Sequence, residues 1–78
     1  MEETIIRDVV KVIPYIKKIH KKKVWLDYDE EADVLYMNFT YPSTAIEHEE
    51  DANGIIRNYD SEGNLVGMTI VGTKRFIR

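Results

Sequence analysis

A ten-residue phrase that occurs twice constrains the fold of this chain more than any other feature. Residues 28–37 align with residues 59–68, and Tyr, Asp, Glu and Met are identical at matching positions. Each copy has β-forming residues on both sides of a turn that opens with Asp. An Asp in this place can accept hydrogen bonds from backbone amides two or three residues further on. The repeat therefore predicts two β-hairpins of similar design.

The turns of the two copies differ at one position. Gly63 stands near the end of the second turn and can adopt the positive φ that a type I turn with a bulge requires. Ala32 stands at the matching place, where a positive φ is costly, so we expect a longer first loop with right-handed geometry throughout. Both turns also have the alternate-acid spacing of a calcium loop. Neither has Gly at loop position 6 or Glu at position 12, so hairpin-turn chemistry is the better interpretation.

Patterning with a period of two runs from Val24 to Val71 with interruptions. It predicts strands at residues 24–28, 34–39, 44–49, 55–59 and 65–71. The segment 44–49 has Ile46 as its one large apolar residue, which is typical of an edge strand. The connections are too short for parallel crossovers, so the predicted sheet of four or five strands is antiparallel.

The first segment has the pattern of an amphipathic helix. Its main apolar residues recur at a 4-3-4-3 spacing, and they are Ile5, Val9, Val12, Ile16 and Ile19. Ile6, Val10 and Ile13 widen this stripe. Pro14 removes one backbone hydrogen bond, so we expect either a kink or two short helices with Pro14 opening the second. The stripe keeps its phase across Pro14, which favours the kink.

These elements predict one α+β domain, in which a Pro-kinked N-terminal helix packs on an antiparallel sheet of two quasi-repeated hairpins. The helical segment is expected at residues 1–22, the sheet at 23–72 and a basic tail at 73–78. A core of this size leaves little net stability, and the chain has no cysteine for a disulfide. We therefore expect a homo-oligomer, a dimer in the simplest case.

Charge is unevenly distributed along the chain. Residues 17–23 hold five lysines, and residues 47–51 hold four acids. The net charge of −3 disfavours binding of nucleic acid over the whole surface. No apolar run is long enough to span a bilayer, and the acidic start does not resemble a signal peptide. We expect a cytoplasmic protein that does not bind membranes.

The residue types needed for catalysis are sparse. His20 and His48 are the histidines, and no Ser or Cys forms a recognisable nucleophile motif with either. There is no glycine-rich phosphate loop and no pattern typical of a zinc site. We therefore expect no enzymatic activity, no cofactor and no bound metal.

The segment WLDYDEEADVLYMNF resembles a known family. The match extends over residues 24–75, and its signature residues are Tyr28, Asp29, Glu31, Ala32, Asp33, Leu35, Tyr36, Val66, Gly67, Met68 and Ile70. The family is the group of small prokaryotic proteins called domain of unknown function 2283. The N-terminal segment with Ile13-Pro14-Tyr15 resembles a subset that carries such an extension. Some members lie beside genes for small toxin-like ribonucleases, which implies an antitoxin or partner-binding role.

Two hypotheses for function follow. The first is a non-enzymatic protein-interaction module, a homo-oligomer that acts as the antitoxin-like partner of a small toxin. The alternative is a nucleic-acid-binding module, because lysines bind phosphates and an aromatic ring can stack on bases. Its candidate contacts are Lys17, Lys18, Lys21, Lys22, Lys23, Trp25, Lys74 and Arg75, with Arg78 in the same tail.

Overall fold

The computed structural model describes residues 2–77 and contains one α-helix, five strands and a short 3₁₀ helix. In chain order these are α1 (Glu2–Ile19), β1 (Trp25–Asp29), β2 (Val34–Asn38), β3 (Glu47–Glu50), β4 (Ile55–Tyr59), β5 (Leu65–Val71) and η1 (Thr73–Phe76). The predicted α+β class and the antiparallel sheet are confirmed. The third strand is shorter than predicted and begins at Glu47.

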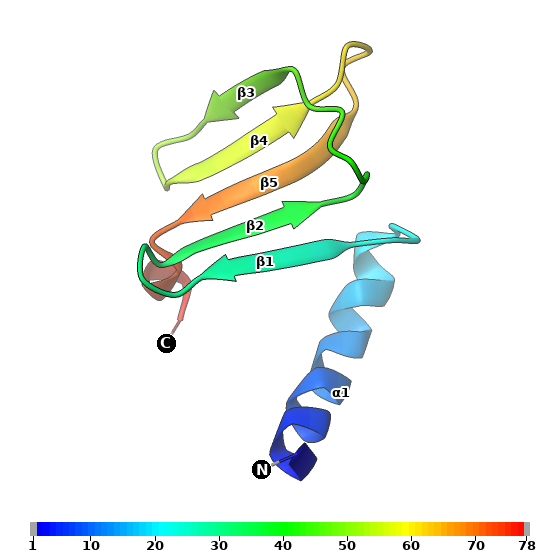
Figure 1. Cartoon of the computed structure of the whole chain (residues 1–78), viewed down its shortest axis with the longest axis vertical. Coiled ribbons are helices and arrows are strands. Elements are labelled where there is room, and N and C mark those ends of the chain that lie inside the picture. The colour runs from blue at the N-terminus through cyan, green and yellow to red at the C-terminus, as the bar shows by residue number, and fades with distance from the viewer. Residues whose placement is uncertain (1, 78) are drawn as a thin grey trace.

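The strands form a single antiparallel sheet in the order β1-β2-β5-β4-β3 (Figure 1). The two predicted hairpins are β1–β2 and β4–β5, and they join through the central pair β2–β5. β3 lies at one edge of the sheet, as the single large apolar residue of segment 44–49 predicted, and β1 lies at the other. An acidic strand suits an edge because its charges oppose pairing with other chains.

The centre of the sheet has an internal symmetry that follows from the repeat. Met37 and Met68 occupy equivalent positions in the two copies, and they lie directly opposite each other in the β2–β5 pair. When equivalent residues of two copies pair with each other, a local two-fold axis passes midway between them. This axis runs through the sheet and relates hairpin β1–β2 to hairpin β4–β5.

Aspartates fix all three hairpin turns. The carboxylate of Asp29 accepts the Ala32 amide at 3.1 Å, and that of Asp60 accepts the Glu62 and Asn64 amides, each at 2.9 Å. Gly63 has a φ of +82°, as predicted. The first turn was predicted to have right-handed geometry throughout. This prediction is wrong, because Asp33 adopts a φ of +55°. An Asp tolerates this conformation better than Ala32 would, so the left-handed residue is displaced by one position.

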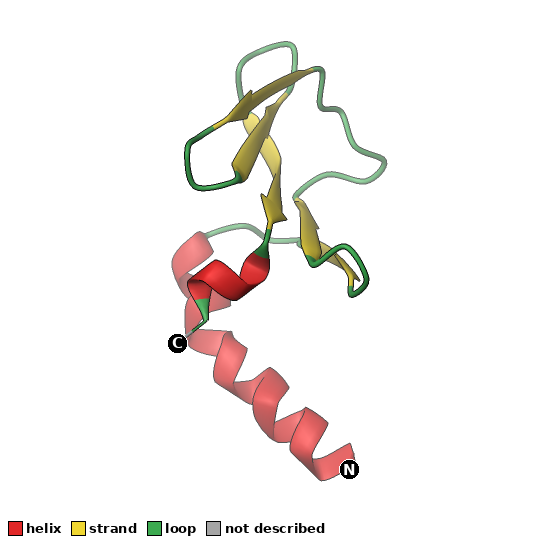
Figure 2. Ribbon diagram, turned by 90° about the vertical axis from the view of Figure 1, so that its left-hand side faces the viewer, coloured by secondary structure: helices red, strands yellow, loops and turns green. Residues whose placement is uncertain are grey.

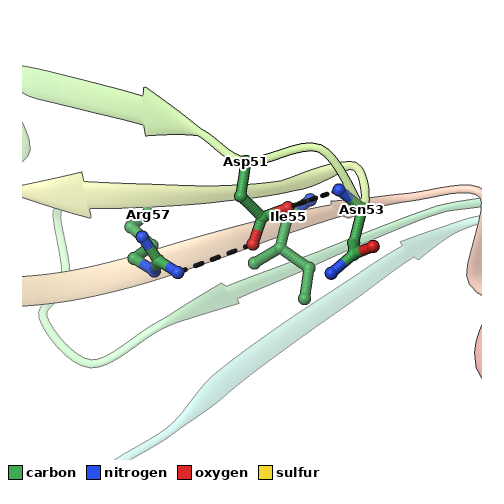
Figure 3. A network of polar contacts seen from close by, with 4 residues as sticks. All are labelled: Asp51, Asn53, Ile55 and Arg57. Carbon is green, nitrogen blue, oxygen red and sulfur yellow. Dashed lines mark hydrogen bonds and ion pairs between the residues drawn. The ribbon is translucent and has the colours of Figure 1, made fainter.

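The β3–β4 turn repeats the same device (Figure 3). The Asp51 carboxylate accepts the Asn53 amide at 2.8 Å and the Ile55 amide at 3.2 Å. Arg57 lies 3.5 Å from its other oxygen, and Gly54 closes the turn with a φ of +83°. The D-x-x-G sequence of residues 51–54 therefore corresponds to that of residues 60–63, although residues 51–54 lie outside the ten-residue repeat.

The helix differs from the prediction in its placement. It continues through Pro14 as one element, so the chain does not split there. It does not pack on the sheet: every side chain of α1 is exposed, and the helix projects from the β1 edge (Figures 1 and 2). His20, with a φ of +60°, ends the helix, and residues 21–24 lead into β1. The stripe shows that α1 must pack on an apolar surface, but it does not specify whose surface that is.

Little of the chain is buried. Among residues 2–77, Val66 is the one apolar side chain that is fully buried, with 5% of its surface exposed. The radius of gyration is 13.8 Å, whereas a compact chain of this length has about 11.5 Å. The accessible surface is 6664 Å², against about 4,900 Å² for a folded monomer of this mass. The fold therefore exposes about 1,700 Å² more than a compact monomer would.

Candidate interaction surfaces

The apolar stripe of α1 is the first candidate surface. Ile5, at the start of the stripe, is 58% exposed, and all the other stripe residues are exposed too. At 100° per residue the apolar positions of α1 span an arc of about 180°. An arc this wide can contact two neighbouring elements at once, because a single coiled-coil seam needs a narrower stripe.

The helix needs such a contact in order to form. Eight of its 18 residues are Ile or Val, whose branched side chains lose rotamer freedom in a helix. Pro14 costs about 3 kcal/mol relative to Ala in a helix interior. Isolated helices shorter than about 12–15 residues are marginal in water even for alanine-rich sequences, and α1 is only slightly longer, at 18 residues, with a poorer helix-forming composition. Packing of the stripe must therefore supply most of the stability of α1.

The second candidate surface is one face of the sheet. The strand registers place a largely apolar set on one side of the sheet: Leu26, Tyr28, Leu35, Met37, Ile55, Met68 and Ile70, with Arg57 beside Met68. We call this set the methionine face, because the Met37–Met68 pair lies at its centre. Leu26 and Tyr28, at its β1 end, are each 53% exposed. Methionine side chains are flexible and adapt well to the shape of a partner.

The opposite face is more polar. Trp25 and Tyr36 lie there, as the alternation of the strands requires, and Trp25 stacks on Tyr41 with 5.6 Å between ring centroids. Asn58 is 92% buried on this face, since 8% of its surface is exposed. Its side-chain oxygen lies 2.6 Å from Nδ1 of His48, and its amide nitrogen lies 3.4 Å from the Thr69 hydroxyl. Each polar group of Asn58 therefore has a partner, which offsets the cost of burial.

The signature residues of the first hairpin form a clasp to the C-terminal segment. The Asp33 carboxylate accepts hydrogen bonds from the Thr73 hydroxyl, from the Tyr28 hydroxyl at 2.8 Å and from the Lys74 amide at 3.2 Å. The Gly72 amide donates to the Asp33 carbonyl at 2.9 Å. We call this arrangement the Asp33 clasp. Asp33 is a signature residue of the first hairpin, but nothing in the local sequence indicates that Thr73 and Lys74, 40 and 41 residues away, are among its partners.

Hydrogen bonds to the clasp and turn carboxylates favour their charged forms. Hydrogen bonds from the Thr73 and Tyr28 hydroxyls lower the pKa of Asp33. The Tyr28–Asp33 hydrogen bond also raises the pKa of Tyr28. The Ile55 and Asn53 amides lower the pKa of Asp51. The Asn64 amide is the main cause of the lowered pKa of Asp60. All three carboxylates are therefore held in the ionised form by the folded structure.

This pattern predicts a loss of stability in acid. A carboxylate with a lowered folded-state pKa stabilises the fold above the unfolded-state value of 3.8. That contribution is lost as the pH falls from 3.8 through the lower folded-state pKa. The urea midpoint should decrease over this window, and it should decrease less in the triple variant Asp33→Asn, Asp51→Asn, Asp60→Asn. Equal slopes for the two proteins would contradict the assignment.

Removing the clasp should destabilise the fold. Asp33→Ala loses the three bonds of the carboxylate and places Ala in a left-handed conformation. We expect the thermal midpoint to fall by roughly 5–10 °C. Asp33→Asn keeps an acceptor oxygen and tolerates the backbone, so it should lose less. Glu31→Ala in the same turn is the matched control, and a loss as large as that of Asp33→Ala would count against the clasp.

The residues predicted to contact nucleic acid fall into two separate groups. Lys17 and Lys18 lie in the last turn of α1, and residues 21–23 lead from it to Trp25 at the start of β1. Lys74 and Arg75 lie in η1, beside the turn at the far end of β1, about 13 Å further along that strand. The structure therefore does not bring the two groups together. Arg78 lies outside the described residues.

Several of these side chains already have partners within the chain. Lys18 lies 5.6 Å from the ring centroid of Tyr15, and Lys21 lies 5.2 Å from that of Phe39. The Arg75 guanidinium donates to the Asn53 carbonyl at 3.0 Å and lies against Gly54. Arg75 thus connects η1 to the β3–β4 turn, which is a structural role.

Concave and metal-binding features are not found in residues 2–77. This part of the chain encloses no pocket and contains no group of three or more His, Cys, Asp or Glu side chains that could hold a metal ion. Across the same residues, no helix has both the length and the apolar character needed to span a bilayer. The surfaces available for recognition are the stripe of α1 and the two faces of the sheet.

Comparison with known proteins agrees with the family resemblance of residues 24–75. No curated protein matches the chain, and no solved structure matches it. A family model described as "Protein of unknown function (DUF2283)" matches residues 25–74, which include the whole sheet and the Asp33 clasp. The match spans more than half of the 78 residues. The chain therefore belongs to the DUF2283 family.

Proposed function

We propose that this chain is a self-associating protein-interaction module, with the methionine face as the surface that binds another protein. The observation that supports this proposal is that the central pair of that face, Met37 and Met68, is only half-buried within the chain. A contiguous apolar surface of this kind is typical of a protein-binding site. The activity that we assign is binding, not catalysis.

We further propose the antitoxin-like role that the family resemblance implies, in which the bound protein is a small toxin. Methionine-rich surfaces can repack around different partners, which suits a module that recognises a related set of proteins. The toxin class itself rests on the resemblance, and the surface argument is independent of it.

Co-expression with the product of the neighbouring gene, followed by pull-down, tests the proposal. Met37→Glu places a charge at the centre of the methionine face and should abolish capture, with circular dichroism to check that the sheet remains folded. Val71→Glu changes an exposed apolar residue on the opposite face and should leave capture intact. Failure of the unsubstituted chain to retain the neighbouring product, or equal loss in both variants, would contradict the proposal.

The nucleic-acid alternative remains a separate proposal without a structural observation in its favour. It requires the lysines of residues 17–23 and the tail to act together, although they lie at opposite ends of β1. A gel-shift titration at low salt tests it, because phosphate contacts weaken steeply as salt is added.

A further inference from the structure

We propose that the apolar stripe of α1 packs against the same stripe of a second copy of this chain, in an antiparallel helix pair. This inference rests on the self-association in the proposed function, because it identifies a second copy of the chain as the partner of the α1 stripe. It leaves the centre of the methionine face to the other protein.

The stripe has the symmetry that such a pair requires. Ile5, Val9, Val12 and Ile16 have a 4-3-4 spacing, which reads the same in both directions about a centre between residues 10 and 11. A two-fold axis at this centre places Ile5 against Ile16 of the second copy, and Val9 against Val12. This is the spacing of a coiled-coil seam, in which side chains of one helix fit between those of the other.

The charges at the two ends of the helix select the antiparallel orientation. The first turn carries Glu2 and Glu3, and the last turn carries Lys17 and Lys18. An antiparallel pair places the acidic first turn of each helix level with the basic last turn of the other. A parallel pair would place acids beside acids and lysines beside lysines, which is unfavourable. The opposed helix dipoles also favour the antiparallel orientation.

The connection between α1 and β1 gives the pair a second contact. The C-terminal end of α1 leads into the β1 edge of its own chain (Figure 1). In the antiparallel pair, the N-terminal half of each helix therefore lies beside the β1 edge of the other chain. Leu26 and Tyr28, the most exposed part of the methionine face, lie at this edge. The second half of the apolar arc, formed by Ile6, Val10 and Ile13, can cover them. The wide apolar arc of α1 thereby contacts both the α1 stripe and the β1 edge of the second copy.

The exposed area agrees with this arrangement. Each chain exposes about 1,700 Å² more than a compact monomer of its mass. Two chains that covered this excess against each other would bury about 3,400 Å² in total, within the range of roughly 2,000–5,000 Å² that is usual for obligate homodimers. A small protein ligand on one face would not account for the exposure of both the helix and the sheet.

A disulfide test follows from the register, because the chain has no cysteine of its own. In the double variant Ile5→Cys, Ile16→Cys, each cysteine faces its counterpart in the second copy. Within one helix the two lie about 16 Å apart and cannot join. Mild oxidation of the dilute full-length protein should therefore convert it almost completely to a disulfide-linked dimer. Ile5→Cys alone should stay unlinked.

The matched control is Arg7→Cys, Lys18→Cys, which has the same spacing on the polar side of α1. It should remain unlinked. Linkage of Ile5→Cys alone would overturn the antiparallel orientation. A dimer by light scattering in which the double variant does not link would overturn the helix pair and leave the proposed binding of another protein intact. The pull-down with Met37→Glu, at the centre of the methionine face that the helix pair leaves open, tests that binding separately.

Discussion

Replacing Val9 and Val12 together by aspartate should leave a monomer with little α-helix. In the antiparallel pair these residues oppose each other at the two-fold axis, so the change gathers four carboxylates in an apolar seam. Burial of unpaired charges costs several kcal/mol per ion, so the dissociation constant should rise by at least roughly 100-fold. The released helix keeps Pro14 and six Ile or Val residues, and it should unfold. Light scattering and far-UV circular dichroism measure the two effects.

The control places the same two aspartates on the polar side of α1, as Arg7→Asp, Lys11→Asp. It changes the net charge more than the stripe variant does, yet it should keep both the dimer and the helix. If this control also dissociated, the loss of the dimer in the stripe variant would be due to added charge rather than to the disrupted apolar seam. A stripe variant that remained dimeric and helical would show that the stripe has no structural role.

Gly67→Ala should cause the largest loss of stability within the sheet, about 2–3 kcal/mol. A Cβ at this position would lie 2.7 Å from the Met37 carbonyl oxygen and 2.8 Å from Oδ1 of Asn38. The carbonyl belongs to the neighbouring central strand and cannot move without disturbing the β2–β5 ladder. Urea unfolding at one fixed protein concentration measures the loss.

Gly63→Ala is the matched comparison, since the substitution is the same and the surroundings differ. Nothing lies within 4 Å of a Cβ at Gly63, and the cost comes from its φ of +82°. A left-handed conformation costs Ala about 1 kcal/mol, so this variant should lose clearly less than Gly67→Ala. Equal losses would show that the close approach at Gly67 is relieved by movement of the strands.

The repeat in the sequence predicted more of the fold than any other feature. Tyr28-Asp29 and Tyr59-Asp60 marked two hairpins because strand alternation and turn chemistry are local properties. The two copies of the repeat also differ at a position where packing requires a smaller residue. Gly67 occupies the position of Tyr36 in the first copy, and its missing side chain makes room for the Asn38 side chain beside it.

Contacts between distant segments were the part that the sequence did not predict. The Asp33 clasp joins residues 40 positions apart, and the first turn places its left-handed residue at Asp33 rather than at the matching Ala32. The burial of Asn58 depends on His48 and Thr69 from two neighbouring strands. Polar residues such as these are normally exposed, so no local pattern marks them for burial.

The helix shows the same limit on a larger scale. Its stripe predicted the element and its apolar side, and these features lie within Glu2–Ile19. The layer that the stripe packs against was expected to be the sheet of the same chain, because that sheet was the one apolar surface visible in a single sequence. Periodicity does not distinguish a surface of the same chain from that of a second copy, and the structure leaves the stripe exposed.

The central claim is that a second copy completes this fold, and the mass in solution tests it most directly. Sedimentation equilibrium of the full-length protein near neutral pH, over a hundredfold range of concentration, should give twice the chain mass of 9.2 kDa. Helicity should persist across the range where the dimer does. A mass of one chain throughout, with the helix of α1 still formed, would contradict the claim.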